Sequence, residues 1–128
     1  MHEFSICQAL VAEVLKELKK HSLPRTRLKN VLVAAGEYHR FVPQSLKFAY
    51  RILTKDTPAK GSSLRIRSIP IKIKCANCGW EGRVKNIALL CKKCGGTDVV
   101  IIDGKELFLE SIEVESEKGT KQARQQKH

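Results

Sequence analysis

The 128-residue chain has few aromatic side chains and no long apolar run. Phe, Trp and Tyr together make up 5% of the residues, and there is a single Trp. A helix that crosses a bilayer needs about 20 consecutive apolar residues, and no segment approaches this length. The first residues, Met1 to Phe4, also lack the basic segment and apolar stretch of a secretory signal. We therefore expect a soluble, cytoplasmic protein without a membrane segment.

Motifs of several common enzyme classes are missing too. The chain contains no glycine-rich phosphate loop and no nucleophile elbow, and no internal repeat is evident beyond two Cys-x-x-Cys units. Glu37 and His39 come nearest to an acid–base pair, but they are close only in sequence. The sequence therefore favours a carrier or binding protein over an enzyme.

Acidic residues are scarce, since 13 Asp and Glu stand against 24 Lys and Arg, and the formal net charge is +11. Such a charge suits nucleic acid, an acidic protein partner or plain solubility equally well. Proteins that bind single strands usually combine a basic groove with stacking aromatic side chains. Here only Trp80 lies near the paired cysteines. A zinc-ribbon nucleic-acid-binding protein therefore stays the alternative to a carrier, with nucleic acid the less favoured partner.

Apolar spacing predicts two helices. From Phe4 to Leu18 the apolar residues recur at helical spacing opposite a charged face, and Cys7 on this stripe is predicted to be a buried small apolar side chain. A second helix begins near Pro43, which suits the first turn of a helix, and ends before Pro58. The predicted buried side of this second helix consists of Leu46, Phe48, Ala49, Ile52 and Leu53.

Three further segments predict strands. Residues 28–35 are rich in Val and Leu and indicate a strand buried on both faces. Residues 64–73 alternate, with a change of phase that a bulge near Ser68 or Pro70 would reconcile. Residues 99–114, with the turn pair Asp103-Gly104, predict a hairpin that returns to the same sheet.

The expected fold class is α+β, with a small mixed sheet of about three strands and two helices on one face. Residues 1–73 and 99–115 are predicted to form an α/β domain. Residues 74–98 are predicted to form an inserted zinc-ribbon-like module with two Cys-x-x-Cys knuckles. Residues 116–128 form a basic tail with almost no apolar residues, which we expect to be disordered.

Four of the five cysteines occur as two Cys-x-x-Cys pairs, Cys75 with Cys78 and Cys91 with Cys94. Without a secretion signal, such pairs favour metal binding over disulfides. Two residues between the cysteines let a tight turn aim both sulfurs at one ion, and zinc prefers a closed tetrahedron of thiolates. We predict a structural Zn(II) site without an open position for a catalytic water. A dithiol redox pair or an iron–sulfur cluster is the alternative.

The N-terminus offers a second metal site. The bulk of His2 should discourage removal of the initiator methionine, so we expect Met1 to be the terminal residue. Its amine, the following amide nitrogen and the imidazole of His2 can then close fused chelate rings around one ion. Ni(II) and Cu(II) favour such nitrogen-rich planar sites. Glu3 could add its amide nitrogen or its carboxylate. The residues alone leave a solvated helix start as the alternative, with Glu3 near the positive end of the helix dipole.

Four features together resemble a known family. They are the opening Met1-His2-Glu3-Phe4-Ser5, the strand that ends at Gly36, the segment from Val42 to Tyr50, and the two Cys-x-x-Cys pairs in this order. They look like the HypA/HybF family of nickel metallochaperones, which helps to insert nickel into NiFe hydrogenase. The resemblance covers residues 1–115 and leaves out only the tail.

The resemblance implies a two-lobed protein that carries Ni(II) as transient cargo at its N-terminus and holds structural Zn(II) in the other lobe. His2 would be the main nickel ligand, and Met1, Glu3 and backbone nitrogens would complete the site. Apart from the resemblance, the place of His39 in the loop after the first predicted strand makes it a candidate additional ligand, with a solvated loop histidine as the favoured alternative. The implied partners are a GTPase of the nickel pathway and the precursor of the hydrogenase large subunit, with urease as a recipient in some organisms. A homodimer, formed by metal bridging or by exchange of the inserted module, is also compatible with this scheme.

Two features depart from the family pattern. The family's knuckles often contain proline, whereas these contain Ala76-Asn77 and Lys92-Lys93. No histidine adjoins the four cysteines, so an exchange of Cys for His at zinc as the pH changes has no local ligand here. We do not expect such a switch in this chain.

Overall fold

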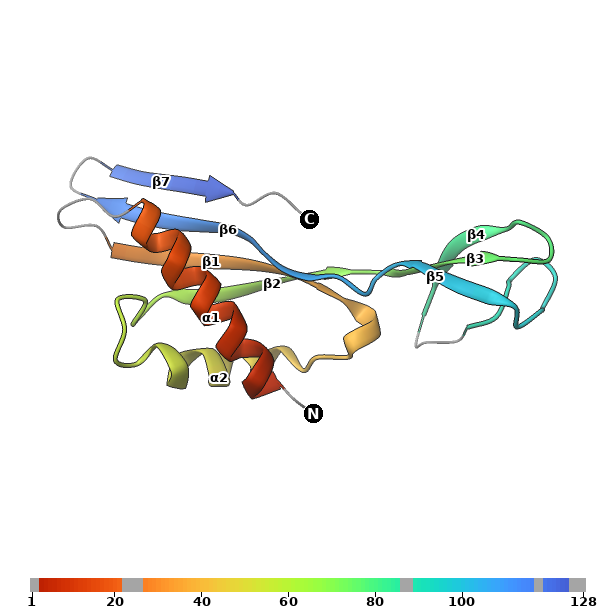
Figure 1. Cartoon of the computed structure of the whole chain (residues 1–128), viewed down its shortest axis with the longest axis horizontal. Coiled ribbons are helices and arrows are strands. Elements are labelled where there is room, and N and C mark those ends of the chain that lie inside the picture. Colours follow the sequence, from red (N-terminus) through yellow and green to blue (C-terminus); the bar gives the residue numbers. More distant parts are fainter. Residues whose placement is uncertain (1–2, 22–26, 86–88, 117–118, 125–128) are drawn as a thin grey trace. The chain divides into compact units, whose positions relative to one another are not determined.

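The computed structural model describes residues 3–21, 27–85, 89–116 and 119–124 of the chain (Figure 1). Met1 and His2 lie outside the described residues, and of Glu3 only the backbone is described. No helix in these ranges is long and apolar enough to cross a membrane.

The chain forms two compact units. The first unit comprises Met1–Val33, Phe41–Arg67 and Phe108–His128, and the second comprises Ala34–Arg40 and Ser68–Leu107. The second unit includes more residues than the predicted module of residues 74–98. The strands on both sides of the cysteine pairs also belong to it.

Two helices pack against each other in the first unit, as predicted. Helix α1 (Glu3–Lys20) buries the apolar stripe that includes Cys7, Val14 and Leu18. Helix α2 (Pro43–Thr54) begins with Pro43 in its first turn, where the missing N–H group of proline costs no helical hydrogen bond. The prediction that Cys7 is buried is confirmed, because its side chain has no exposed surface.

The buried side of α2 was predicted only in part. Leu46 and Ala49 are buried, but Phe48 is 59% exposed and Ile52 is 47% exposed. Tyr50 and Thr54 occupy the inner side instead. The physical reason is helical spacing: residues three and four apart share one face, so a face built on Leu46, Ala49 and Tyr50 turns Phe48 and Ile52 toward solvent.

The first unit also contains a four-stranded sheet of order β2-β1-β6-β7. Its strands are β1 (Arg27–Gly36), β2 (Ser63–Ile69), β6 (Leu107–Ser116) and β7 (Gly119–Arg124). In Figure 1, β1 and β2 run in the same direction and are joined through η1 (Glu37–His39) and α2, whereas β7 is antiparallel to β6. The sheet is therefore mixed, as predicted, with one strand more than expected.

The additional strand corrects the prediction of a disordered tail. Residues from Gly119 to Arg124 pair with β6, in a register that runs from Ser116 opposite Gly119 to Ser111 opposite Arg124. Without this partner β6 would be the edge of the sheet, with a row of unpaired backbone groups. Backbone pairing needs little apolar side-chain area, which is why the polar composition of the tail misled the prediction.

The second unit contains a three-stranded antiparallel sheet of order β4-β3-β5. Its strands are β3 (Ile71–Cys75), β4 (Glu81–Val84) and β5 (Val99–Asp103). Its small core consists of Ile71, Ile73 and Val84, against which four partly buried side chains pack. These four are Trp80, Leu89, Val99 and Ile101.

Two strand predictions are wrong. Residues 99–114 do not form a hairpin in one sheet, because β5 pairs with β3 while β6 pairs with β7. Residues 64–73 do not form one bulged strand either: β2 ends at Ile69, Pro70 interrupts the pattern, and β3 belongs to the other sheet. The change of phase after Ile66 marks the passage from the core of one unit to the core of the other.

The segments that lead into the second unit pass very close to one another. The N–H group of Gly36 donates to the carbonyl oxygen of Glu106 over 2.6 Å, and that of Tyr38 donates to Gly104 over 3.0 Å. A Cβ atom on Gly104 would lie 2.6 Å from the Cα atom of Ile71. Gly104 therefore fits this crossing because it has no side chain.

Candidate metal centre

Each cysteine pair lies in a backbone turn, and the two turns are of the same kind. The N–H group of Gly79 donates to the carbonyl oxygen of Cys75 over 3.0 Å, and that of Gly95 donates to Cys91 over 2.8 Å. Both glycines have positive φ angles, 80° and 74°, a conformation that glycine adopts without strain. The two knuckles are therefore matching turns, one at the end of β3 and one before β5.

A second hydrogen bond closes each turn. Cys75 donates its N–H group to Trp80 over 2.8 Å, and Cys91 donates to Gly96 over 2.9 Å. The first cysteine of each pair is buried and the second is at the surface. Since the proline-free sequences between the cysteines still form these turns, the departure from the usual family pattern leaves the arrangement of the sulfurs intact.

The four sulfur atoms lie within 4.8 Å of one another. The Cys75 and Cys94 sulfurs are 3.7 Å apart, and the Cys78 and Cys91 sulfurs are 3.4 Å apart. In a tetrahedron with Zn–S bonds of about 2.3 Å, sulfurs lie about 3.8 Å apart. The cluster therefore has the dimensions and the donor atoms that a zinc ion requires.

The ionisation of these thiols also fits a bound cation. For Cys91 burial raises the pKa, but hydrogen bonds from the backbone N–H groups of Cys94 and Lys93 outweigh it and lower the pKa to about 6. At Cys94 the N–H group of Gly96 lowers the pKa, but hydrogen bonds with the sulfurs of Cys91 and Cys75 favour the protonated thiol and raise the pKa to about 11. All four sulfurs can be thiolates together only if a positive ion lies between them.

One backbone hydrogen bond and one aromatic side chain connect the first knuckle with the strands of the second unit. The N–H group of Ala76 donates to the carbonyl oxygen of Asp98 over 2.8 Å, which ties the first knuckle to the chain leading into β5. The ring of Trp80 lies over Gly82, where an added Cβ atom would be 2.3 Å from it. The basic residues beside the cysteines, including Lys92 and Lys93, are exposed.

The predicted nickel ligands Met1 and His2 lie outside the described residues, as does the side chain of Glu3. The candidate additional ligand His39 belongs to η1 in the second unit. Its Nε2 atom lies 2.6 Å from the carbonyl oxygen of Lys105 and donates to it, and its ring meets Tyr38 edge-on. Glu37 accepts a hydrogen bond from Ser68, so the two side chains considered as an acid–base pair have separate partners.

Comparison with known proteins gives one consistent family. The family described as hydrogenase/urease nickel incorporation, metallochaperone, hypA matches residues 1–114. A hydrogenase maturation factor HypA from Dehalococcoides mccartyi is 36% identical over 117 residues, which cover 91% of this chain and 97% of that protein. Another, from Caldanaerobacter subterraneus, is 37% identical over 116 residues, which cover 90% of this chain and 100% of that protein.

The fold has a match among solved structures. The solution structure of the Ni metallochaperone HypA from Helicobacter pylori matches with a TM-score of 0.62 at 24% identity. The match covers 88% of this chain and 96% of that chain. At this level of identity the likeness supports the fold alone.

Proposed function

The chain belongs to the HypA family of nickel metallochaperones for hydrogenase and urease, and we propose that it binds one Ni(II) ion through Met1, His2 and Glu3 at its N-terminus. The observation that carries this proposal is the sequence Met1-His2-Glu3, of which Glu3 is the first residue of α1. The amine, the amide nitrogens and the imidazole there form a nitrogen-rich donor set of the kind that Ni(II) favours. Carbonyl and carboxylate oxygens alone would suit harder ions.

The family is one of metallochaperones, so the prediction that this protein is not an enzyme is confirmed. We assign the four-cysteine cluster to a structural Zn(II) ion rather than to the cargo. Four thiolates complete a tetrahedron and leave no place for an exchanging ligand. An ion that must be released to a client is better held at an accessible chain terminus.

Nickel delivery involves two protein partners in this proposal. A GTPase of the nickel pathway assists, and the precursor of the hydrogenase large subunit receives the ion in the cytoplasm, with urease as a further recipient. The family assignment supports the maturation role. It also favours this role over the nucleic-acid-binding alternative, because the positive charge then serves protein association.

Metal analysis tests the nickel site. Purified protein loaded with nickel, dialysed and analysed by mass spectrometry should contain about one nickel and one zinc per chain. His2→Ala, or a short N-terminal extension, should remove the nickel and leave the zinc, because each change destroys the chelate at the terminus.

One further histidine variant serves as a control, and another tests the ligand set. His21→Ala changes a histidine that pairs with Glu17 at the end of α1, and it should retain nickel. His39→Ala tests whether this side chain completes the ligand set. Equal nickel binding by the wild type and His2→Ala would show that the assigned site is wrong.

A further inference from the structure

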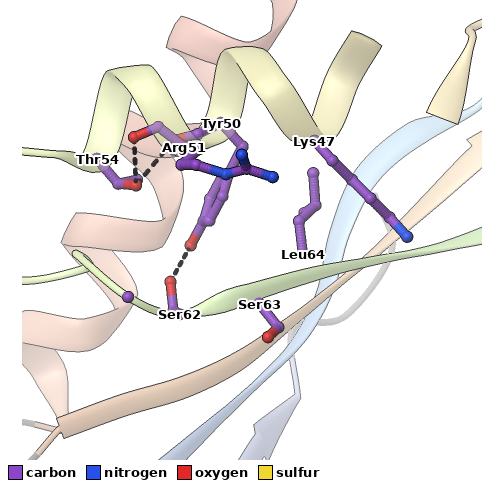
Figure 2. A pocket seen from close by; sticks show the side chains of 8 residues that line it. Lys47, Tyr50, Arg51, Thr54, Ser62, Ser63 and Leu64 are labelled. Carbon is purple, nitrogen blue, oxygen red and sulfur yellow. Dashed lines mark hydrogen bonds between the residues drawn. The ribbon is translucent and has the colours of Figure 1, made fainter. Parts of the chain in front are cut away.

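The first unit contains a pocket between α2 and the start of β2 that no step of nickel binding uses (Figure 2). Its volume is about 350 Å³. Lys47 and Arg51 reach over it from the helix, and Ser62 and Ser63 lie across from them on the other segment. The complete lining consists of Lys47, Tyr50, Arg51, Thr54, Gly61, Ser62, Ser63 and Leu64.

The polar groups deep in the pocket already have partners. The hydroxyl of Ser62 donates to the carbonyl oxygen of Ala59 over 2.6 Å, so Tyr50 donates its own O–H group to Ser62 over 2.6 Å. Thr54 donates to the carbonyl oxygen of Tyr50 over 2.8 Å. These hydroxyls therefore fix the shape of the pocket and have no O–H group left for a ligand.

The cations at the rim lack such partners. Among the residues that the structure describes, neither Lys47 nor Arg51 forms an ion pair or a side-chain hydrogen bond. They stand four residues apart on one helix and are both exposed. A guanidinium group matches a carboxylate with two parallel hydrogen bonds, and an ammonium group can add a third. The rim is therefore suited to an oxyanion.

Exposed apolar side chains lie beside these cations. Phe48 and Ile52 each follow one of the two cations in sequence, so they form the neighbouring row of the helix surface. Their exposed fractions are 59% and 47%. Single exposed apolar residues are ordinary, but an aromatic residue, an aliphatic residue and an arginine grouped together are typical of the centre of a protein interface.

We propose that this surface, the α2 face of Lys47, Phe48, Arg51 and Ile52, docks an acidic segment of a client protein. A carboxylate of the client segment binds between Lys47 and Arg51 above the pocket. Apolar side chains of the same segment cover Phe48 and Ile52. The net charge of +11 favours approach to an acidic protein. This proposal rests on one part of the proposed function, namely that a nickel carrier binds a client protein. It does not depend on which residues bind the nickel.

A peptide titration tests the α2 face. The full chain with zinc bound is titrated with a fluorescent helical peptide that carries Glu and Leu on one side, and binding is followed by anisotropy. The same peptide with Gln in place of Glu should bind more weakly. Arg51→Glu should weaken binding of the acidic peptide at least tenfold, which is about 1.4 kcal/mol, and Phe48→Ser should weaken binding of both peptides.

The matched control is Lys19→Glu, which makes the same change of charge on an exposed residue of α1. It should bind the peptide like the wild type. The proposal is overturned if the wild type does not bind the acidic peptide, or if Arg51→Glu and Lys19→Glu weaken binding equally. It is also overturned if inorganic phosphate or phosphatidylglycerol vesicles bind in an Arg51-dependent way and the peptide does not.

Nickel and zinc analysis of the same variants separates this proposal from the proposed function. Arg51→Glu should retain both metals and the circular dichroism of the wild type, because the side chain of Arg51 is exposed and is not a predicted ligand of either metal. Loss of peptide binding with nickel retained supports the α2 face. Loss of nickel in His2→Ala with peptide binding retained supports the terminal site.

Discussion

Gly104 lies where two segments of the second unit pass too close together for a side chain. Its φ angle is +100°, and a Cβ atom would meet the backbone of Pro70 and Ile71 at less than 3 Å. Backbone atoms cannot rotate away as the end of a side chain can. The close crossing of these segments therefore depends on the absence of a side chain at this position.

We expect Gly104→Ala to destabilise the second unit strongly, because it combines a steric clash with a left-handed conformation. Gly61→Ala is the matched control. Gly61 has a φ angle of +82° but no atom within 4 Å of an added Cβ atom, so it should lose only about 1–2 kcal/mol. Urea denaturation measures both losses, followed by Trp80 fluorescence for the second unit and by the circular dichroism of the helices for the first unit, which contains Gly61. Similar losses in both variants would show that the crossing is looser than described.

At the same scale, the four clustered cysteines could be predicted because local spacing determines their geometry. Two residues between cysteines and a glycine after each pair suffice to form the turn that brings the two sulfurs of that pair together. The pairing of β3 with β5 then brings the two turns together. The exposed Phe48 and the pocket beneath Lys47 and Arg51 could not be predicted this way. They depend on which face of α2 meets the rest of the unit, and apolar composition alone does not determine that.

Among the helices and strands, too, local features could be predicted from the sequence and long-range pairings could not. The positions of both helices and of β1 along the chain were predicted well, since their apolar periodicity is a property of the segment itself. The partners of β3, β5 and β7 were not, because strand pairing joins residues that are far apart in sequence. The change of phase between Ile66 and Ile69 and the proline at position 70 are local signs that the chain passes from one sheet to the other.

The strand β7 makes a testable contribution to the first unit. Removal of residues 117–128 should leave nickel and zinc content unchanged, lower the thermal unfolding midpoint and promote self-association. The edge of the sheet would then be the apolar-rich β6 instead of the polar β7, whose Lys121 and Arg124 discourage pairing with another chain. Size-exclusion chromatography and thermal unfolding measure these effects. Removal of only residues 125–128 is the control and should change neither, whereas identical behaviour of the two truncations would argue against a role for β7.

At the scale of the whole molecule, the two units differ in what stabilises them. The first combines two helices and a sheet around a core that includes Val14, Leu28 and Leu46. In the described part of the second unit, the buried cluster of large aliphatic side chains in its sheet consists of Ile71, Ile73 and Val84, with partly buried neighbours. So few buried side chains rarely sustain a fold alone, and small domains of this kind usually need a metal or disulfides.

Zinc removal should therefore unfold the second unit and spare the first. Treatment with a strong chelator, or the substitution Cys91→Ser, should remove the zinc and collapse the amide NMR signals of β3, β4 and β5, because metal binding and folding are coupled in small zinc modules. The signals of α1 and α2 should remain, and nickel capture that depends on His2 should persist. Cys7→Ala, which changes the cysteine outside the cluster, should keep its zinc and the signals of both units. Loss of the α1 and α2 signals on chelation would instead mean that the zinc stabilises the entire chain.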